Sequence, residues 1–325
     1  MKATVQKGGE IFIEQSDRPQ KKAGEAIVRI KACGICGSDV PRVFADKSYY
    51  YPIVLGHEFS GVVEESEKPN LVGKRVAVFP LLPCKECEFC AKEQYANCVR
   101  YDYYGSRRDG GMQDWLSVKE ENLVVLPDGV SYEAGAMAEP LAVCLHAVKK
   151  ANIAEGESVV VYGAGTIGLL CGMWAKALGA KQAYFVDIDE RKLLTAESLG
   201  FARFDGQEIE VAIEASGASA CLNGCLQSVK AFGRVIIVGN ASKDMCIDRA
   251  NYSLILRKQL TLCGSWNSDF GSKVNDWKEC LSAVAQGKIV PETLISHRFL
   301  LADTQKAFEV IKNGEFYNKI MVVTE

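Results

Sequence analysis

The segment VVVYGAGTIGLL constrains the fold of this chain more than any other feature. Its first four residues, Val159–Tyr162, form an apolar run that predicts a buried strand. The strand leads into a G-x-G-x-x-G turn from Gly163 to Gly168, which opens an amphipathic helix running to Leu178. In such a strand–turn–helix unit, the glycines let the backbone approach a pyrophosphate at the helix N-terminus. The segment therefore predicts a dinucleotide-binding sheet.

Three later segments continue this pattern. QAYFVD predicts a second strand that ends at Asp187, nineteen residues after Gly168. An acid at this place binds the adenosine ribose hydroxyls and repels the extra phosphate of NADP, so we expect NAD as the cofactor. VAIEAS and RVIIVG predict two further strands, which gives the β-α-β alternation of a doubly wound sheet.

Four cysteines lie close together in PCKECEFCAKEQYANC, at Cys84, Cys87, Cys90 and Cys98. Disulfides are disfavoured, because cysteines three residues apart would strain so tight a loop. The first three match an iron–sulfur run, but the fourth follows after seven residues instead of three and no proline comes after it. Four thiolates also suit one tetrahedral zinc ion and would fill its coordination shell. We expect a structural zinc site, with an iron–sulfur cluster as the alternative.

A second group of candidate ligands comes from separated segments. KACGICGSD contains Cys36 and Ser38, and LGHEFSG contains His57 and Glu58. An isolated histidine more often forms an ordinary hydrogen bond. A catalytic zinc site, however, combines three protein ligands of mixed type with one position open to substrate. We therefore expect catalysis here and not at the cysteine cluster.

Composition excludes some classes of function. The formal net charge of −3 argues against a nucleic-acid or membrane-surface partner. A length of 325 residues is enough for two domains. Thirteen cysteines without an evident secretion signal indicate a reducing compartment, so we expect a cytoplasmic protein.

These motifs occur in the order found in the zinc-containing medium-chain alcohol dehydrogenases, and the chain resembles that family over essentially its whole length. It is most similar to the polyol branch, because AEPLAVCLHA places Glu139 where that branch has an acidic residue near zinc. The polyol-phosphate members of the branch are similar in CGSDVPRVF, YYPIVLGHEFSG, PLLPC, YDYYGSRRDGG and ILRKQLTLCGSW. The resemblance implies an NAD- and zinc-dependent oxidoreductase that forms a homodimer or homotetramer.

The resemblance also implies an α/β architecture. Residues 1–140 would form a β-rich, GroES-like catalytic domain with the structural zinc lobe. Residues 141–264 would form the Rossmann domain, and residues 265–325 would return to the catalytic domain. The substrate would then lie between the two domains.

Roles follow residue by residue from the resemblance. Cys36 and His57 would bind the catalytic zinc, Glu139 would be the third ligand, and Glu58 would be a fourth ligand or a support behind the others. Ser38 would accept the proton of the substrate hydroxyl. Cofactor contacts would come from Gly163, Gly165, Thr166, Ile167, Gly168, Asp187 and Lys192.

The chain departs from the family in two places. Many members have a histidine five residues after the cysteine ligand as the last step of a proton relay, but Pro41 stands there and carries no proton. The link from Gly200 to Val211 is also short for the strand and helix that this fold usually has, so we expect a trimmed nucleotide domain on that side of its sheet.

The substrate is indicated by Arg107 and Arg108 in GSRRDGG, because guanidinium groups offer phosphate paired donors in one plane. Solvent-exposed arginines are the alternative. We predict oxidation of a secondary alcohol of a polyol phosphate to the ketose phosphate, with hydride transfer to NAD. Other possibilities are an unphosphorylated polyol such as sorbitol, a threonine-like substrate, or a zinc-stabilised binding protein without catalysis.

Overall fold

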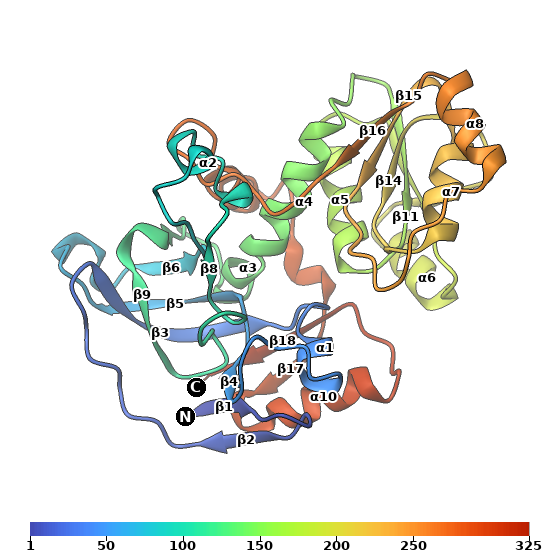
Figure 1. Cartoon of the computed structure of the whole chain (residues 1–325). Coiled ribbons are helices and arrows are strands. Elements are labelled where there is room, and N and C mark those ends of the chain that lie inside the picture. Colours follow the sequence, from blue (N-terminus) through green and yellow to red (C-terminus); the bar gives the residue numbers. More distant parts are fainter. Residues whose placement is uncertain (325) are drawn as a thin grey trace. The chain divides into compact units, whose positions relative to one another are not determined.

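A computed structural model describes residues 1–324. The chain divides into two compact units (Figure 1). One unit combines Met1–Leu141 with the chain from Asp269 onward, and the other is Ala142–Ser268. A single continuous segment thus builds the second unit, while both ends of the chain build the first.

The unit Ala142–Ser268 is a doubly wound sheet of six parallel strands in the order β13-β12-β11-β14-β15-β16. The central strand is buried on both faces, as the apolar run predicts. The strand order reverses between β11 and β14, where sheets of this kind bind nucleotides. The strands are β11 (Ser158–Tyr162), β12 (Gln182–Val186), β13 (Ala202–Arg203), β14 (Ile209–Glu214), β15 (Val229–Ile237) and β16 (Thr261–Gly264). The helices are α5 (Thr166–Ala177), α6 (Glu190–Ser198), α7 (Ser219–Ser228) and α8 (Arg249–Arg257).

The connection from β13 to β14 is unusually short, as the sequence predicts. It consists of residues 204–208, which contain no helix. Phe204 covers part of the sheet face instead, with its ring 6.4 Å from the rings of both Tyr162 and Tyr184. One aromatic side chain therefore packs where this fold usually has a crossover helix.

The other unit contains a seven-stranded sheet in the order β10-β6-β5-β3-β18-β17, with β9 also paired to β3. Its strands are β3 (Glu25–Gly34), β5 (Glu58–Glu65), β6 (Arg75–Val78), β9 (Trp115–Lys119), β10 (Leu123–Val125), β17 (Ile295–Leu300) and β18 (Lys319–Val323). Smaller sheets contain β1 (Lys2–Val5), β2 (Ile11–Glu14) and β4 (Ile53–Val54), and β7 (Leu81–Leu82) with β8 (Asp102–Tyr103). Because β18 pairs antiparallel with β3, the C-terminal segment completes the sheet that the N-terminal segment begins.

Short helices connect these strands. The α-helices are α1 (Val40–Phe44), α2 (Glu88–Ala91), α3 (Tyr132–Ala136), α4 (Ala138–Lys150), α9 (Asp276–Ala285) and α10 (Thr304–Lys312). The 3-10 helices are η1 (Pro69–Leu71), η2 (Tyr95–Asn97), η3 (Glu120–Asn122), η4 (Pro291–Leu294) and η5 (Leu301–Asp303).

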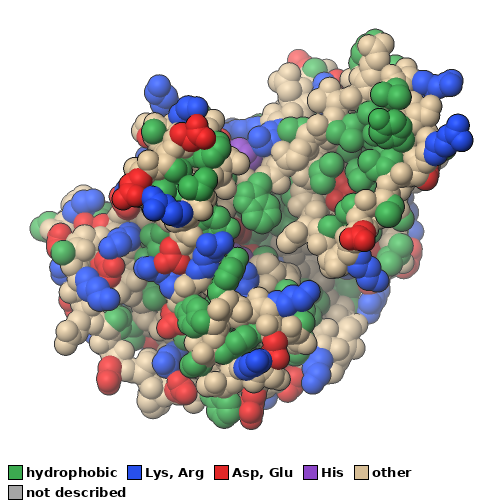
Figure 2. Space-filling model, in the orientation of Figure 1, with side chains coloured by type: hydrophobic (Ala, Val, Ile, Leu, Met, Phe, Trp, Pro, Cys, Tyr) green, Lys and Arg blue, Asp and Glu red, His purple; other side chains and the backbone are tan. Residues whose placement is uncertain are grey.

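The surface carries both signs of charge. On the face shown in Figure 2, basic and acidic side chains are interspersed, in keeping with 38 lysines and arginines against 41 acidic residues. Within the described residues, none of the helices has the length and apolar character that crossing a membrane requires.

Candidate functional site

Three of the predicted metal ligands meet where β3 ends and β5 begins. Gly34 of β3 pairs with Glu58 of β5, so Cys36, just beyond β3, comes to His57, just before β5. The Cys36 sulfur, a ring nitrogen of His57 and a carboxylate oxygen of Glu58 all lie within 4.8 Å of one another. A Cβ atom on Gly34 would lie 2.2 Å from Oε2 of Glu58, so a side chain at this position would displace the carboxylate.

Asp39 is fully buried beside these ligands. Its Oδ2 accepts a hydrogen bond of 3.0 Å from the backbone N–H of Cys36, and its Oδ1 lies 3.5 Å from Nδ1 of His57. Burial disfavours the imidazolium, but the charges of Asp39 and Cys36 outweigh it and raise the pKa of His57 well above its usual value. Asp39 therefore orients the imidazole and anchors the Cys36 loop, as groups behind metal ligands commonly do.

Glu58 forms a buried ion pair with Lys319, the first residue of β18. The two residues are 1% and 3% exposed, and Nζ of Lys319 also donates to the carbonyl of Ile35 at 3.0 Å. Burial opposes the charged lysine, but Glu58 and Cys36 outweigh this and raise the pKa of Lys319. Glu58 thus has a fixed cationic partner in addition to any metal.

Glu139, in α4, lies outside the group of three ligands but is linked to it. The hydroxyl of Tyr103 donates to Oε1 of Glu139 at 3.2 Å, and the Tyr103 ring packs against His57 with 5.8 Å between centroids. Burial raises the pKa of Glu139 to about 7, with His57 opposing the rise and Glu58 adding to it. The site therefore holds two carboxylates, of which the structure brings Glu58 into the tighter group.

The charges at this site fit a divalent cation. Four groups are negative when ionised: Cys36, Asp39, Glu58 and Glu139. Two are positive: Arg42 and Lys319. With His57 neutral, as an imidazole that binds a metal must be, the excess of two negative charges is what one divalent ion would balance. A thiolate, an imidazole and a carboxylate are ligands that zinc accepts.

Ser38 lies two residues beyond Cys36 and is half-buried. A guanidinium nitrogen of Arg42 donates to its Oγ at 3.3 Å and to its backbone oxygen at 2.8 Å. The hydroxyl therefore has a fixed cationic neighbour beside the candidate metal ligands.

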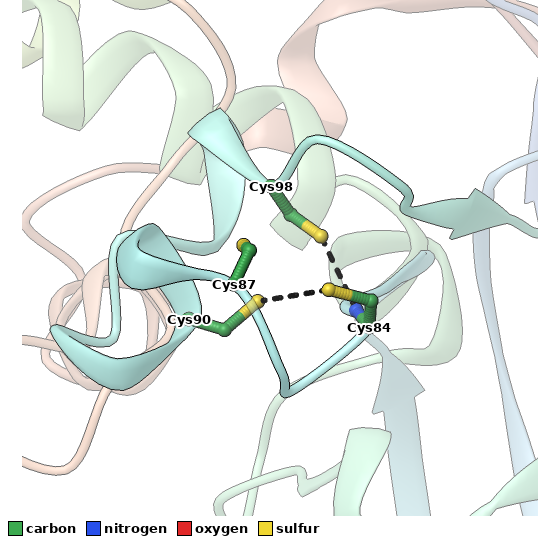
Figure 3. A group of neighbouring side chains, drawn as sticks. All are labelled: Cys84, Cys87, Cys90 and Cys98. Carbon is green, nitrogen blue, oxygen red and sulfur yellow. Dashed lines mark hydrogen bonds between the residues drawn. The ribbon is translucent and has the colours of Figure 1, made fainter.

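The four cysteines of the predicted structural site also come together, in the lobe that contains α2 (Figure 3). The sulfurs of Cys84 and Cys90 lie 3.9 Å apart, and the backbone N–H of Cys84 donates to the sulfur of Cys98 at 3.2 Å. Backbone N–H groups of Val99 and Cys90 lower the pKa of Cys87 to about 6, which favours its thiolate. Sulfurs bound tetrahedrally at 2.3 Å to one ion lie ~3.8 Å apart. This spacing fits a single ion better than a cluster.

The predicted nucleotide turn lies between β11 and α5. A Cβ atom on Gly168 would lie 1.8 Å from the carbonyl oxygen of Gly163, so the helix approaches the turn more closely than any side chain permits. At Gly165, before the first residue of α5, an added Cβ would meet nothing within 4 Å. The turn thus leaves open space at a helix N-terminus, as binding of a pyrophosphate requires.

Asp187 follows β12 and is held by two backbone amides. Its Oδ2 accepts from Ala164 at 2.7 Å and its Oδ1 from Asp189 at 2.9 Å. Lys192 lies in the first turn of α6, where its backbone N–H donates to Asp189 at 3.0 Å. The acid is therefore fixed beside the glycine turn, with the lysine on the adjoining helix.

The two arginines of GSRRDGG differ in their surroundings. Arg108 is ion-paired with Asp102 at 2.6 Å. Arg107 lies between the rings of Tyr49 and Tyr101, 4.6 and 4.3 Å from their centroids, and its buried Nε has no hydrogen-bond partner among the described residues. The terminal nitrogens of Arg107 donate to the Tyr101 carbonyl at 3.1 Å and to the Tyr49 hydroxyl at 3.2 Å. Among the described residues Arg107 therefore has no carboxylate partner, unlike Arg108.

Sequence reasoning missed four residues that surround the ligands. The sequence contains a hint for two of them. Asp39 directly follows Ser38 in CGSD, and Lys319 is the one charged residue in the apolar strand KIMVV. Tyr103 and Arg42 had no such indication, because only the fold brings them to the site.

Comparisons with known proteins agree on the family. Residues 22–128 match the alcohol dehydrogenase GroES-like domain, and residues 166–286 match the zinc-binding dehydrogenase family. Galactitol 1-phosphate 5-dehydrogenase of Escherichia coli is 34% identical over 336 residues, covering 97% of both chains. Sorbitol dehydrogenase 1 of Saccharomyces cerevisiae is 33% identical, covering 98% of this chain and 96% of the relative.

Solved structures agree as well. The crystal structure of galactitol-1-phosphate dehydrogenase from Escherichia coli superimposes with a TM-score of 0.93 at 34% identity, covering 99% of this chain and all of that chain. A zinc-binding dehydrogenase from Sinorhizobium meliloti bound to NADP gives 0.90 at 26% identity, covering 99% and 98%. A dehydrogenase from Escherichia coli in complex with NADH gives 0.89 at 25%, with the same coverage. The similarity to galactitol-1-phosphate 5-dehydrogenase that CGSDVPRVF and YDYYGSRRDGG predict is thus confirmed.

Proposed function

Because the chain belongs to the zinc-binding dehydrogenases of the medium-chain alcohol dehydrogenase family, we propose that it oxidises a secondary alcohol of a polyol phosphate to the ketose phosphate, with NAD as hydride acceptor. One observation carries the proposal. Cys36, His57 and Glu58 come together from separated segments in a site whose charges call for a divalent cation.

The chemistry divides between bound groups and side chains. Zinc and NAD, when bound, would supply a Lewis acid for the substrate oxygen and an acceptor for hydride. Cys36 and His57 would hold the metal, with Glu58 or Glu139 as the carboxylate ligand. Ser38 would take the proton of the substrate hydroxyl, a role that contributes typically ~10²- to 10⁴-fold in rate.

Arg107 supports a phosphorylated substrate. The rings of Tyr101 and Tyr103 are 6.2 Å apart, and Tyr103 packs against His57, so aromatic contacts connect Arg107 to the candidate metal site. The charge of Arg107 has no carboxylate partner among the described residues and is available to a phosphate, whereas Arg108 already has Asp102. We therefore assign the phosphate to Arg107.

NAD is the proposed cofactor, because the carboxylate of Asp187 would repel the phosphate that distinguishes NADP. The backbone amides of Ala164 and Asp189 fix this carboxylate beside the glycine turn. We further propose a cytoplasmic homodimer or homotetramer, which light scattering coupled to gel filtration would test.

The deciding experiment combines metal analysis with a screen of NAD reduction over paired substrates. Galactitol and its 1-phosphate, and sorbitol and its phosphate, are compared by kcat/KM. We expect two zinc ions per chain and at least ~10-fold preference for a phosphorylated polyol. Equal kcat/KM values within each pair would remove the phosphate assignment. If none of the polyols or polyol phosphates were oxidised, the proposed function would be overturned.

Variants sharpen the test of the phosphate assignment. Arg107→Met should raise KM for the phosphorylated substrate while leaving kcat/KM for the unphosphorylated polyol within ~2-fold. Arg108→Met is the matched control and should change neither. If Arg108→Met raised KM for the phosphorylated substrate and Arg107→Met did not, the phosphate would be assigned to Arg108.

A further inference from the structure

The proton acceptor Ser38 has a neighbour that neither the motifs nor the family comparisons assign. Arg42 follows Pro41, the residue that stands where many relatives have the relay histidine. One guanidinium nitrogen of Arg42 donates to the Oγ of Ser38 at 3.3 Å and to the backbone oxygen of Ser38 at 2.8 Å. The same nitrogen donates to Oδ1 of Asp39 at 3.2 Å.

Hydrogen bonds to both the N–H and the carbonyl group of Arg42 hold its backbone in place. Its N–H donates to the carbonyl of Asp39 at 3.0 Å, and its carbonyl accepts from the hydroxyl of Tyr51 at 2.5 Å. The side chain is only 16% exposed, so little conformational freedom remains to the guanidinium. Its position is thus a built feature of the loop and α1.

The chemistry of a guanidinium limits what this contact does. Arginine has five N–H donors, no acceptor, and a charge that proteins do not remove. Arg42 therefore does not pass a proton onward. Because Oγ of Ser38 accepts a hydrogen bond from the guanidinium, the hydroxyl hydrogen of Ser38 points away from Arg42. The guanidinium also stabilises negative charge that develops on Oγ during proton transfer.

We propose that Arg42 is a positioning residue that orients Ser38 for proton transfer. This inference rests on the proposed function and deepens it. Ser38 gives its own hydroxyl proton to water while its Oγ accepts the proton of the substrate hydroxyl, and Arg42 supplies the orientation and charge stabilisation at Oγ. The role differs from that of a relay histidine, which would itself carry the proton.

Pairing with Asp39 is the other role that the contacts allow. If Arg42 only neutralised the buried carboxylate, its loss would lower stability and zinc content, and it would act independently of the Ser38 hydroxyl. A double-mutant cycle separates the two roles, because groups that act through one another are not additive.

The cycle uses the zinc-loaded full chain and four proteins: wild type, Arg42→Met, Ser38→Ala and the double variant. Steady-state kcat and KM are measured with the preferred polyol, zinc content by elemental analysis, and NADH binding by fluorescence. Arg42→Met should lower kcat ~10-fold or more with KM within ~3-fold, and Arg42→Lys should recover part of the loss. In the Ser38→Ala background, Arg42→Met should change kcat less than ~3-fold.

Two outcomes would overturn the inference. One is an unchanged kcat in Arg42→Met, and the other is an equal loss of kcat in both backgrounds. Should Arg42→Met fail to fold or to hold zinc, the same cycle with Arg42→Lys decides between the same results. An inactive wild type would refute the proposed function instead, so the two failures are distinct.

Discussion

Replacing Lys319 with methionine tests the buried electrostatics behind the candidate metal site. Methionine preserves the length of the side chain but removes the ammonium from Glu58 and from the carbonyl of Ile35. Both members of the pair are almost completely buried, at 3% and 1% exposure. Breaking such a pair costs about 3–5 kcal/mol, because the remaining carboxylate is left without a partner.

This magnitude is large enough to measure by calorimetry. For a domain of 150–250 residues, 1 kcal/mol corresponds to ~2–4 °C in Tm, so Lys319→Met should lower Tm by roughly 6–20 °C. Urea unfolding should show the same loss as a lower midpoint with an unchanged slope. All variants are compared with one zinc per chain, at the cysteines, so that a metal at Glu58 neither replaces the lost ammonium nor contributes to Tm.

Two controls accompany this variant. Lys306→Met removes an exposed ion pair with Asp303 and should leave Tm almost unchanged, because solvent screens such a pair. The double variant Lys319→Met/Glu58→Met should recover much of the loss, since it leaves no unpaired charge. A loss in Lys319→Met no greater than that in Lys306→Met would refute the reasoning.

Three further predictions follow from the other sites. Cys90→Ser should remove one zinc per chain and lower Tm, with the NADH dissociation constant within ~2-fold; a full zinc content in the variant would contradict the structural site. Gly168→Ala places a Cβ atom 1.8 Å from the Gly163 oxygen and should weaken NADH binding at least ~10-fold at unchanged zinc content, so an unaltered fluorescence titration would be evidence against the turn. Asp187→Ser should lower the NAD-to-NADP ratio of kcat/KM at least ~10-fold, and an unchanged ratio would remove Asp187 from cofactor selection.

Much of the fold was predictable because its patterns are local. The strand, glycine turn and helix from Val159 to Leu178 lie within one segment, and so do the cysteines of the structural site. The short link after Gly200 also predicted a trimmed sheet edge, by comparison with the fold that the resemblance implies. The packing of Phe204 in place of a crossover helix was not predictable, since it depends on which side chains of the sheet face that segment.

The candidate metal site was only partly predictable. Cys36 and His57 were paired by resemblance, and the register of β3 with β5 gives the physical reason for their meeting. The ion-pair partner of Glu58 is Lys319, which is far from it in the sequence. The pairing of β18 with β3 and β17 places Lys319 beside Glu58. Such long-range contacts leave no periodic trace in the sequence.

The central claim is that Cys36, His57 and a carboxylate surround one ion. Anomalous diffraction at the zinc edge from crystals of the full chain tests it most directly. We predict two peaks per chain, one among the four cysteines and one within bonding distance of the Cys36 sulfur and the His57 ring. A single peak at the cysteines, in protein that oxidises its substrate, would contradict the account.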